Sequence, residues 1–297
     1  MTLDTSAATF QGERKRLTML AYRMLGRMSE AEDAVQDAYL RWQAADQGDI
    51  RVPGAWLTTT TVRLCLDRMR KAKASREVYV GPWLPEPVLT PEGGEREMTS
   101  GPESFAQDLS MGLMLVLERL GPEERAAFIL REAFDSSYAE IATALGKNEA
   151  AVRQIVSRAR ERVKGARKRY DPLPGAHEKL MTEMLRAIEA KDPIALAGLL
   201  TKDASFTSDA GGKRTAALRV VTGAEDVAKL IVHVMSNAGG GSEKVRQLNF
   251  NGAPGLWVID RQGFENAIQI ELDGDHIAAI YVVRNPDKLA HISAAVH

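Results

Sequence analysis

The chain has 297 residues, of which 44% are hydrophobic, a formal net charge of −1 and one cysteine, Cys65. This length is enough for two or three domains, and a single cysteine excludes an internal disulfide. No apolar stretch approaches the ~18 residues that a membrane helix needs. The N-terminus, with Asp4 and Glu13, lacks the apolar block of a signal peptide. We expect a cytoplasmic protein without membrane contact, in which Cys65 is a small core residue.

The near-neutral net charge of the whole chain conceals two basic segments. Residues 63–76 carry six Arg or Lys against one acid, Asp67, and residues 151–170 carry eight against one acid, Glu161. Such clusters are an electrostatic footprint for phosphate, although either segment alone could be only a solvated helix face. The sequence therefore predicts two separate sites for nucleic acid.

Helical periodicity begins near the N-terminus, where apolar residues from Leu17 to Met28 form one stripe over residues 14–28. Ser29 and Glu32 then have the pattern of a capping box that starts a second helix. One face of this helix is apolar and holds Ala31, Ala34, Val35, Ala38 and Trp42. The other face holds Asp33, Gln36, Asp37, Leu40 and Arg41. After a loop, a third helix is expected from about Ala55 to Arg76.

Residues 81–104 have the composition of a linker, because eleven of these 24 residues are Gly, Pro or Ser. The beginning of the linker is different, because two large apolar side chains stand in an extended proline segment and need a groove. This segment consists of Trp83, Leu84, Pro85, Glu86 and Pro87.

Helices are expected again from about 105 to 168, with one helix start marked by Gly121 and Pro122. Residues 137–160 fit a helix-turn-helix, because side chains of the required size recur at the spacing that two crossing helices need. The packing positions are Ile141, Ala142, Leu145, Gly146, Val152 and Ile155. Ser137 with Glu140 is expected to cap the first helix, and Asn148 the second.

The second helix of such a motif enters the major groove of DNA with its N-terminal part. The candidates for contacts with base edges are therefore Glu149, Ala150, Arg153, Gln154 and Ser157. The candidates for contacts with phosphates, or for packing, are Arg158, Arg160, Arg162 and Lys164.

A boundary at 171–175 is followed by a segment with α+β character. Two helices are expected at about 177–190 and 193–200. Phe264, Asn266, Ile268, Ile270 and Leu272 then alternate with more polar residues, which predicts a half-buried strand. Asp273 and Gly274 form a hairpin signal, and residues 277–283 would be the return strand.

Residues 10–170 resemble the extracytoplasmic-function sigma factors, the smallest members of the sigma-70 family. Residues 32–42 resemble the helix that binds the clamp helices of the polymerase β′ subunit, and residues 55–71 resemble the part that reads and melts the −10 element. Residues 120–125 and the helix-turn-helix resemble the sigma-4 region, which reads the −35 element. The resemblance implies that promoter DNA and core RNA polymerase, through its β′ clamp helices and β flap, are the partners.

By this resemblance, polymerase would face Asp33, Gln36, Asp37, Leu40 and Arg41, although a merely solvated acidic face would have the same pattern. The −10 element would meet Arg63, Asp67, Arg68, Arg70, Lys71 and Lys73. Residues 43–54 would form the loop that captures unstacked bases. Their sequence holds no aromatic residue, so no pocket can be assigned.

Three further motifs resemble the subgroup of these sigma factors with a fused SnoaL-like, NTF2-like domain. The first is the proline segment that begins at Trp83. The second is Asp209, Ala210, Gly211, Gly212 and Lys213, in which Ala210 departs from the usual glycine and could restrict the loop. The third is Asn285, Pro286, Asp287, Lys288 and Leu289. The subgroup implies regulation in cis, without a separate anti-sigma protein.

Four parts are therefore predicted: an all-α sigma-2 domain at 1–80, a linker at 81–104, an all-α sigma-4 domain at 105–170 and an α+β cone at 176–297. We expect no enzyme, no cofactor and no metal, because no spacing of His, Cys and acids suits a metal. A ligand-binding or catalytic cone stays an alternative. Its polar candidates are Asp209, His233, Asp260 and His276, and its walls would be Phe206, Trp257, Phe264 and Tyr281. A helix-turn-helix repressor is disfavoured, because it would not need the first domain.

Overall fold

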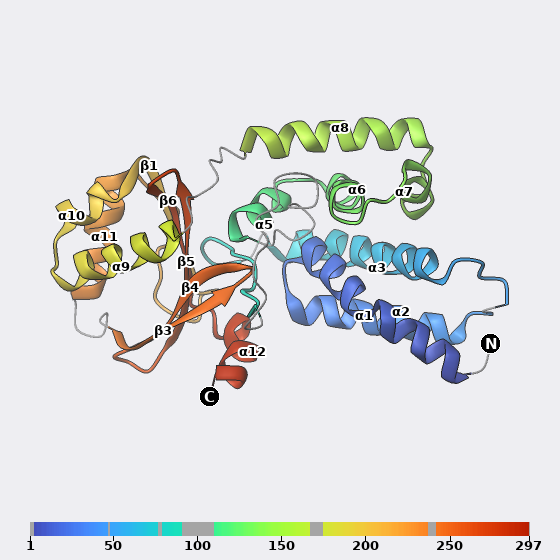
Figure 1. Cartoon of the computed structure of the whole chain (residues 1–297), viewed down its shortest axis with the longest axis horizontal. Coiled ribbons are helices and arrows are strands. Elements are labelled where there is room, and N and C mark those ends of the chain that lie inside the picture. Colours follow the sequence, from blue (N-terminus) through green and yellow to red (C-terminus); the bar gives the residue numbers. More distant parts are fainter. Residues whose placement is uncertain are drawn as a thin grey trace. The chain divides into compact units, whose positions relative to one another are not determined.

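The computed structural model describes residues 3–46, 48–76, 79–90, 110–166, 175–236 and 242–296 (Figure 1). The described chain divides into two compact units. Residues 3–76 and 113–166 belong to the first unit, and residues 79–90, 110–112 and 175–296 belong to the second, with the gaps given above. Each unit is taken by itself below.

The first unit begins with α1 (Leu3–Leu25), α2 (Met28–Ala44) and α3 (Pro53–Arg76). The predicted capping box at Ser29 is wrong, because α2 begins at Met28 with Arg27 as a cap that makes no side-chain bond. Gly26 causes this earlier start. Its φ of 74° turns the chain sharply after α1, so the predicted apolar stripe ends at Leu25.

The two faces of α2 are as predicted. The apolar face is buried, and the indole Nε1 of Trp42 donates to the carbonyl of Ser6 at 3.1 Å, which fastens α2 to α1. On α3, Cys65 is fully buried, and burial raises the pKa of its thiol to about 12. Cys65 is therefore an inert core residue, as expected.

The first unit continues with α5 (Met111–Glu118) from Leu113 onward, and with α6 (Pro122–Ala133), α7 (Tyr138–Leu145) and α8 (Glu149–Ala166). The predicted start at Gly121 and Pro122 is confirmed, since Pro122 is the first residue of α6 and the Gly121 amide donates to Glu124 at 3.1 Å. The predicted start at about 105 lies outside the described residues.

The second unit is α+β, as predicted. It contains α9 (Ala176–Glu189), α10 (Pro193–Gly198), α11 (Ala224–Ser236) and α12 (Pro286–Val296) around a six-stranded sheet of order β2-β1-β6-β5-β4-β3. The strands are β1 (Leu200–Asp209), β2 (Val221–Thr222), β3 (Ser242–Phe250), β4 (Ala253–Asp260), β5 (Glu265–Asp273) and β6 (His276–Val283). Among the described strands, only β1 and β6 pair in parallel.

Helices cover both faces of this sheet. Figure 1 shows α9, α10 and α11 on one side, where Leu196, Val227, Leu256 and Ile270 share a core, and α12 on the other side. The hairpin after β5 is confirmed, with Gly274 at a φ of 63°.

The predicted half-buried strand at 264–272 is only partly right. Ala267 and Gln269, expected to face solvent, are also buried, while Ile268 is half-buried. The reason is that α12 packs on β5, so the second face of the sheet is covered too. No helix among the described residues is long and apolar enough to cross a membrane.

Gly255 on β4 is predicted to tolerate no side chain. A Cβ there would lie 2.7 Å from the Phe250 ring and 2.8 Å from the Ile268 carbonyl oxygen. Gly255→Ala should lower the free energy of unfolding by about 1–3 kcal/mol, as overpacking does. Thermal or urea denaturation measures this loss.

Gly198→Ala is the matched control, because a Cβ at the end of α10 meets nothing within 4 Å. This variant should unfold like the parent or slightly later. Equal losses in both variants would contradict the crowding at Gly255.

Candidate nucleic-acid interfaces and a linker clasp

The turn between α7 and α8 has the predicted caps. The Ser137 hydroxyl and amide donate to the Glu140 carboxylate at 2.8 and 2.7 Å, and these two bonds lower the pKa of Glu140. The Glu140 amide donates back to the Ser137 hydroxyl at 3.2 Å. Gly146 has a φ of 64°, and Asn148 accepts from the Ala151 amide at 2.8 Å. Each cap satisfies backbone groups that a helix end leaves open.

Side chains fill the space between these two helices as predicted. Ile141 and Val152 are fully buried, and Ala142 and Ile155 are nearly so. Leu145 is only half-buried. The pair α7–α8 therefore has the packing and caps of a helix-turn-helix, with α8 in the position of the recognition helix.

The predicted base-reading residues are exposed on α8. They are Glu149, Ala150, Arg153, Gln154 and Ser157. The Arg153 guanidinium is already oriented, because it pairs with Glu149 at 2.8 Å and lies 4.7 Å from the centroid of the Tyr138 ring.

The phosphate candidates on α8 divide into two kinds. Arg160 pairs with Glu132 at 2.6 Å and Arg162 pairs with Glu124 at 2.6 Å, so both brace α8 against α6. Arg158 and Lys164 are exposed.

On α3, four of the predicted −10 residues are exposed: Arg63, Asp67, Arg70 and Lys71. Arg68 is half-buried and pairs at 2.6 Å with Asp37 of α2, which joins the −10 set to the polymerase set. The Lys73 side chain lies outside the described part. On α2, Asp33, Gln36, Leu40 and Arg41 are exposed, and Leu40 stands out as an apolar side chain that is 54% exposed.

The loop after α2 borders an open hollow of about 480 Å³. Its lining is Ala45, Asp46, Asp49, Ile50, Arg51, Val52 and Trp56. Trp56 supplies the aromatic ring that residues 43–54 lack, and its ring lies 5.6 Å from that of Trp42. Sequence reasoning placed Trp56 in the −10 stretch of residues 55–71 but not beside the base-capturing loop, because Trp56 belongs to α3. The first turn of a helix nevertheless borders the preceding loop.

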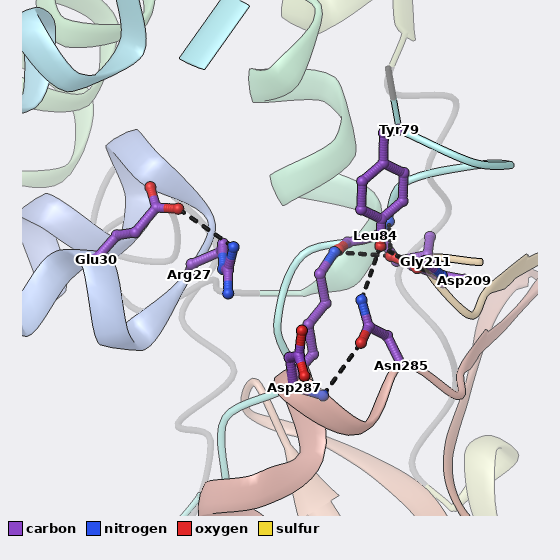
Figure 2. Close-up of polar contacts among 9 residues, drawn as sticks. Arg27, Glu30, Tyr79, Leu84, Asp209, Gly211, Asn285 and Asp287 are labelled. Carbon is purple, nitrogen blue, oxygen red and sulfur yellow. Dashed lines mark hydrogen bonds and ion pairs between the residues drawn. The ribbon is translucent and has the colours of Figure 1, made fainter. Parts of the chain in front are cut away.

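In the second unit, the carboxylate of Asp209 is the centre of a polar cluster at the end of β1 (Figure 2). It is fully buried. It accepts from the Tyr79 hydroxyl at 2.5 Å, the Leu84 amide at 2.8 Å and the Lys288 ammonium at 2.7 Å. It also accepts from the Gly211 amide at 3.1 Å. These donors come from residues 79–84, from the loop after β1 and from α12.

Lys288 completes the cluster from α12. Its ammonium also donates to the Leu84 carbonyl at 2.5 Å and lies 4.2 Å from the Trp83 ring centroid and 5.3 Å from that of Tyr79. Its side chain is 1% exposed. A buried charge requires a partner of opposite sign and filled hydrogen bonds, and Lys288 has both. We call Tyr79, Trp83, Leu84, Asp209, Asn285 and Lys288 the clasp.

Residues 79–90, which we call the strap, remain attached beyond the clasp. Glu86 is buried and pairs with His291 at 3.0 Å. The Val88 amide donates to Asn251 at 2.8 Å, and the Thr90 amide donates to the Asn249 carbonyl at 2.8 Å. The first part of the predicted linker is therefore bound along the C-terminal domain, and residues 91–104 of that linker lie outside the described part.

The three motifs singled out in the sequence thus meet in one place. Leu84, Pro85 and Leu289 are buried, and Pro286 begins α12. Gly211 and Gly212 have φ values of 56° and 73°. Ala210 is buried without a positive φ, so the expected restriction of the loop does not arise.

Lys213 and Asp287 form an exposed ion pair at the edge of this cluster. Sequence reasoning missed Tyr79 and His291. No pattern distinguishes either one, because each finds its partner only across the folded chain.

The comparisons with known proteins agree with these features. Residues 9–75 match the family model "Sigma-70 region 2", and residues 110–163 match "Sigma-70, region 4". The chain is 37% identical over 289 residues to the ECF RNA polymerase sigma factor SigJ of Mycobacterium tuberculosis, covering 94% of this chain and 91% of SigJ. This chain belongs to the extracytoplasmic-function (ECF) sigma factors.

Two further similarities cover the whole ECF sigma factor. The crystal structure of Mycobacterium tuberculosis SigJ matches with a TM-score of 0.76 and 33% identity, covering 96% of this chain and 98% of that one. A probable ECF sigma factor, SigI of the same species, is 28% identical over 98% of this chain and 97% of its own length. The predicted family, and a fused α+β domain after two helical sigma regions, are confirmed.

The polar residues considered for catalysis lie on four different elements of this ECF sigma factor, β1, β4, α11 and β6. Asp209 belongs to the clasp, and Asp260 pairs with Arg284 at 3.0 Å while capping the turn before β5. His276 pairs with Asp275, and His233 is exposed on α11. Among the described residues, no group of His, Cys, Asp and Glu could hold a metal ion.

The Lys288–Asp209 pair is predicted to be essential for strap attachment. Lys288→Met leaves a buried carboxylate without its cation, which costs about 3–5 kcal/mol. We expect faster hydrogen exchange at residues 79–90, measured by mass spectrometry, and earlier unfolding of the C-terminal domain.

Lys213→Met is the control, because the Lys213–Asp287 pair is half-exposed and such pairs contribute at most about 1 kcal/mol. If the two variants exchange alike, the clasp does not hold the strap.

Proposed function

We propose that this sigma factor uses three surfaces of its helical unit in promoter-directed initiation. The exposed face of α2 around Leu40 meets the β′ clamp helices of core polymerase, and α8 reads the −35 element. The β flap would bind the sigma-4 domain. The cations of α3, together with the hollow at Trp56, act on the −10 element. The sigma factor then works in the cytoplasm, beside polymerase.

The hollow carries the −10 assignment. Opening a duplex requires a place where an unstacked base can rest, and stacking on an aromatic ring contributes about 1–3 kcal/mol per base. Trp56 offers such a ring at the wall of a hollow, and the basic residues of α3 follow it on the same helix. Phosphate contacts from those residues would position the strand.

Trp56→Ala should therefore slow transcription from a duplex promoter by roughly 5- to 150-fold, which corresponds to the loss of about 1–3 kcal/mol of stacking. A template with a pre-opened −10 bubble should recover most of the loss, and Trp56→Phe should stay near the parent. In vitro transcription with core polymerase measures all three. An equal loss on both templates would mean that Trp56 only supports Trp42.

We further propose that the C-terminal domain regulates the sigma factor in cis by holding the strap. The observation that supports this is the clasp, in which buried Asp209 and Lys288 bind the linker itself. The strap spans roughly 40 Å when extended, and this length is withdrawn from the connection between the two promoter-reading regions. Because tether length sets the effective concentration of the second contact, the bound strap restrains simultaneous binding.

This mechanism needs little energy. A free-energy difference of about 2.7 kcal/mol keeps ~99% of a population in one state, and the apparent affinity then falls about 100-fold. A bound linker would perform the restraint that a separate anti-sigma protein performs elsewhere, so none is required. The C-terminal domain would therefore act by binding rather than catalysis, and a small ligand would be one means of release.

Promoter assays test the clasp directly. Lys288→Met should raise the apparent affinity for core polymerase, by up to about 100-fold if ~1% of the parent is competent, and Lys213→Met should not. Titration of labelled protein with core polymerase, followed by transcription, gives both quantities. Unchanged or weakened binding in Lys288→Met would refute regulation by the strap.

A further inference from the structure

Two promoter-reading regions touch within the first unit. Helix α7 of the sigma-4 region packs on α3 of the sigma-2 region, as Figure 1 shows. The Arg63 guanidinium donates to the carbonyl of Thr143 at 2.9 Å and to that of Ala144 at 3.3 Å. Both carbonyls belong to the last turn of α7.

These carbonyls are natural acceptors for a cation. The last carbonyls of a helix have no partner within it, and the C-terminus carries partial negative charge. The Ala142 carbonyl is satisfied by the amides of Gly146 and Lys147, which leaves the next two to Arg63. A residue expected to bind phosphate therefore caps the helix-turn-helix.

Other contacts hold the same two regions together. Arg70, also of the −10 set, lies 3.6 Å from Glu123 of α6. Arg125 of α6 is 2% exposed and donates to the carbonyl of Met24 at the end of α1, at 2.7 Å. The guanidinium carbon of Arg16 on α1 lies 5.7 Å from the centroid of the Phe134 ring.

We propose that the sigma-4 region is an internal occupant of the −10 surface, with the α7 carbonyls and Glu123 in the places that phosphates take in the promoter complex. This inference rests on the proposed role of Arg63 and Arg70 at the −10 element. It does not involve the strap, because every contact lies within the first unit. Promoter DNA must displace α7 from α3 before Arg63 can bind a phosphate.

An order of events follows from which surfaces are covered. Arg153, Gln154 and Ser157 on α8 are exposed in this closed form, whereas the Arg63 guanidinium is hydrogen-bonded to the carbonyl of Thr143. A −35 duplex can therefore bind without separation of the two regions. Binding of the −10 strand requires separation.

Pulsed electron–electron double resonance on the full chain tests whether the sigma-2 and sigma-4 regions are held together. Spin labels are placed at Lys15→Cys on α1 and Ala139→Cys on α7, both exposed positions. Cys65 does not compete, because it is buried and its thiol pKa is raised to about 12. The parent should give one short distance.

Arg63→Lys is the informative variant. Lysine keeps the charge but lacks the fork that binds two carbonyls at once, so a longer-distance population should grow several-fold. Arg14→Lys, an exposed substitution on α1, should leave the distance unchanged. Circular dichroism confirms that each variant is folded.

DNA binding gives a second test, in which the same spin-label distance is measured in the labelled protein that keeps Arg63. A −10 single strand from a promoter active in the transcription assay should produce the longer distance, and the −35 duplex alone should not. The proposal is overturned if Arg63→Lys and the single strand both leave the short distance intact. If transcription with core polymerase fails but Arg63→Lys gives the longer distance, the proposed function is rejected. The inferred contact between α7 and α3 through Arg63 is then still supported.

Discussion

The buried pair between Asp209 and Lys288 is the interaction on which the second unit depends. A carboxylate and an ammonium that are buried away from solvent are tolerated only when their remaining hydrogen-bond donors and acceptors also have partners. Here the remaining lone pairs are filled by Tyr79 and by the backbone of Leu84, both in the strap. Without the strap the pair would be poorly satisfied, and without the pair the strap would lose its anchor at Tyr79 and Leu84. Folding of the domain and binding of the linker are therefore coupled.

In the first unit, charged side chains make contacts between the sigma-2 and sigma-4 regions. Arg63, Arg70 and Arg16 are all partly solvated, and each finds an acceptor or a ring on the sigma-4 region. Contacts of this kind are individually weak and are screened by salt. Arg125 differs from these three because it is buried, so its bond to the Met24 carbonyl is costly to break. The guanidinium groups of Arg63 and Arg70 would use the same donors for phosphates, so under the proposal above DNA can replace these two contacts.

Local rules allowed the helical parts to be predicted from the sequence. The faces of α2, the caps at Ser137 and Asn148 and the turn at Gly146 follow from residue type and spacing within one or two helical turns. The capping box at Ser29 failed because Gly26, three residues earlier, already determines where α2 begins. The burial of Gln269 was missed because it depends on α12, which is distant in the sequence.

The site residues show the same limit. The three motifs around Trp83, Asp209 and Lys288 could be grouped by family resemblance, but the buried geometry that joins them could not be derived, because Tyr79 and the Leu84 backbone carry no sequence signal. Asp209 illustrates the consequence: the same residue was a candidate acid–base catalyst and a candidate docking residue. Its four donors decide between these roles, because a carboxylate that is saturated by the strap and Lys288 has no lone pair left to accept a substrate proton.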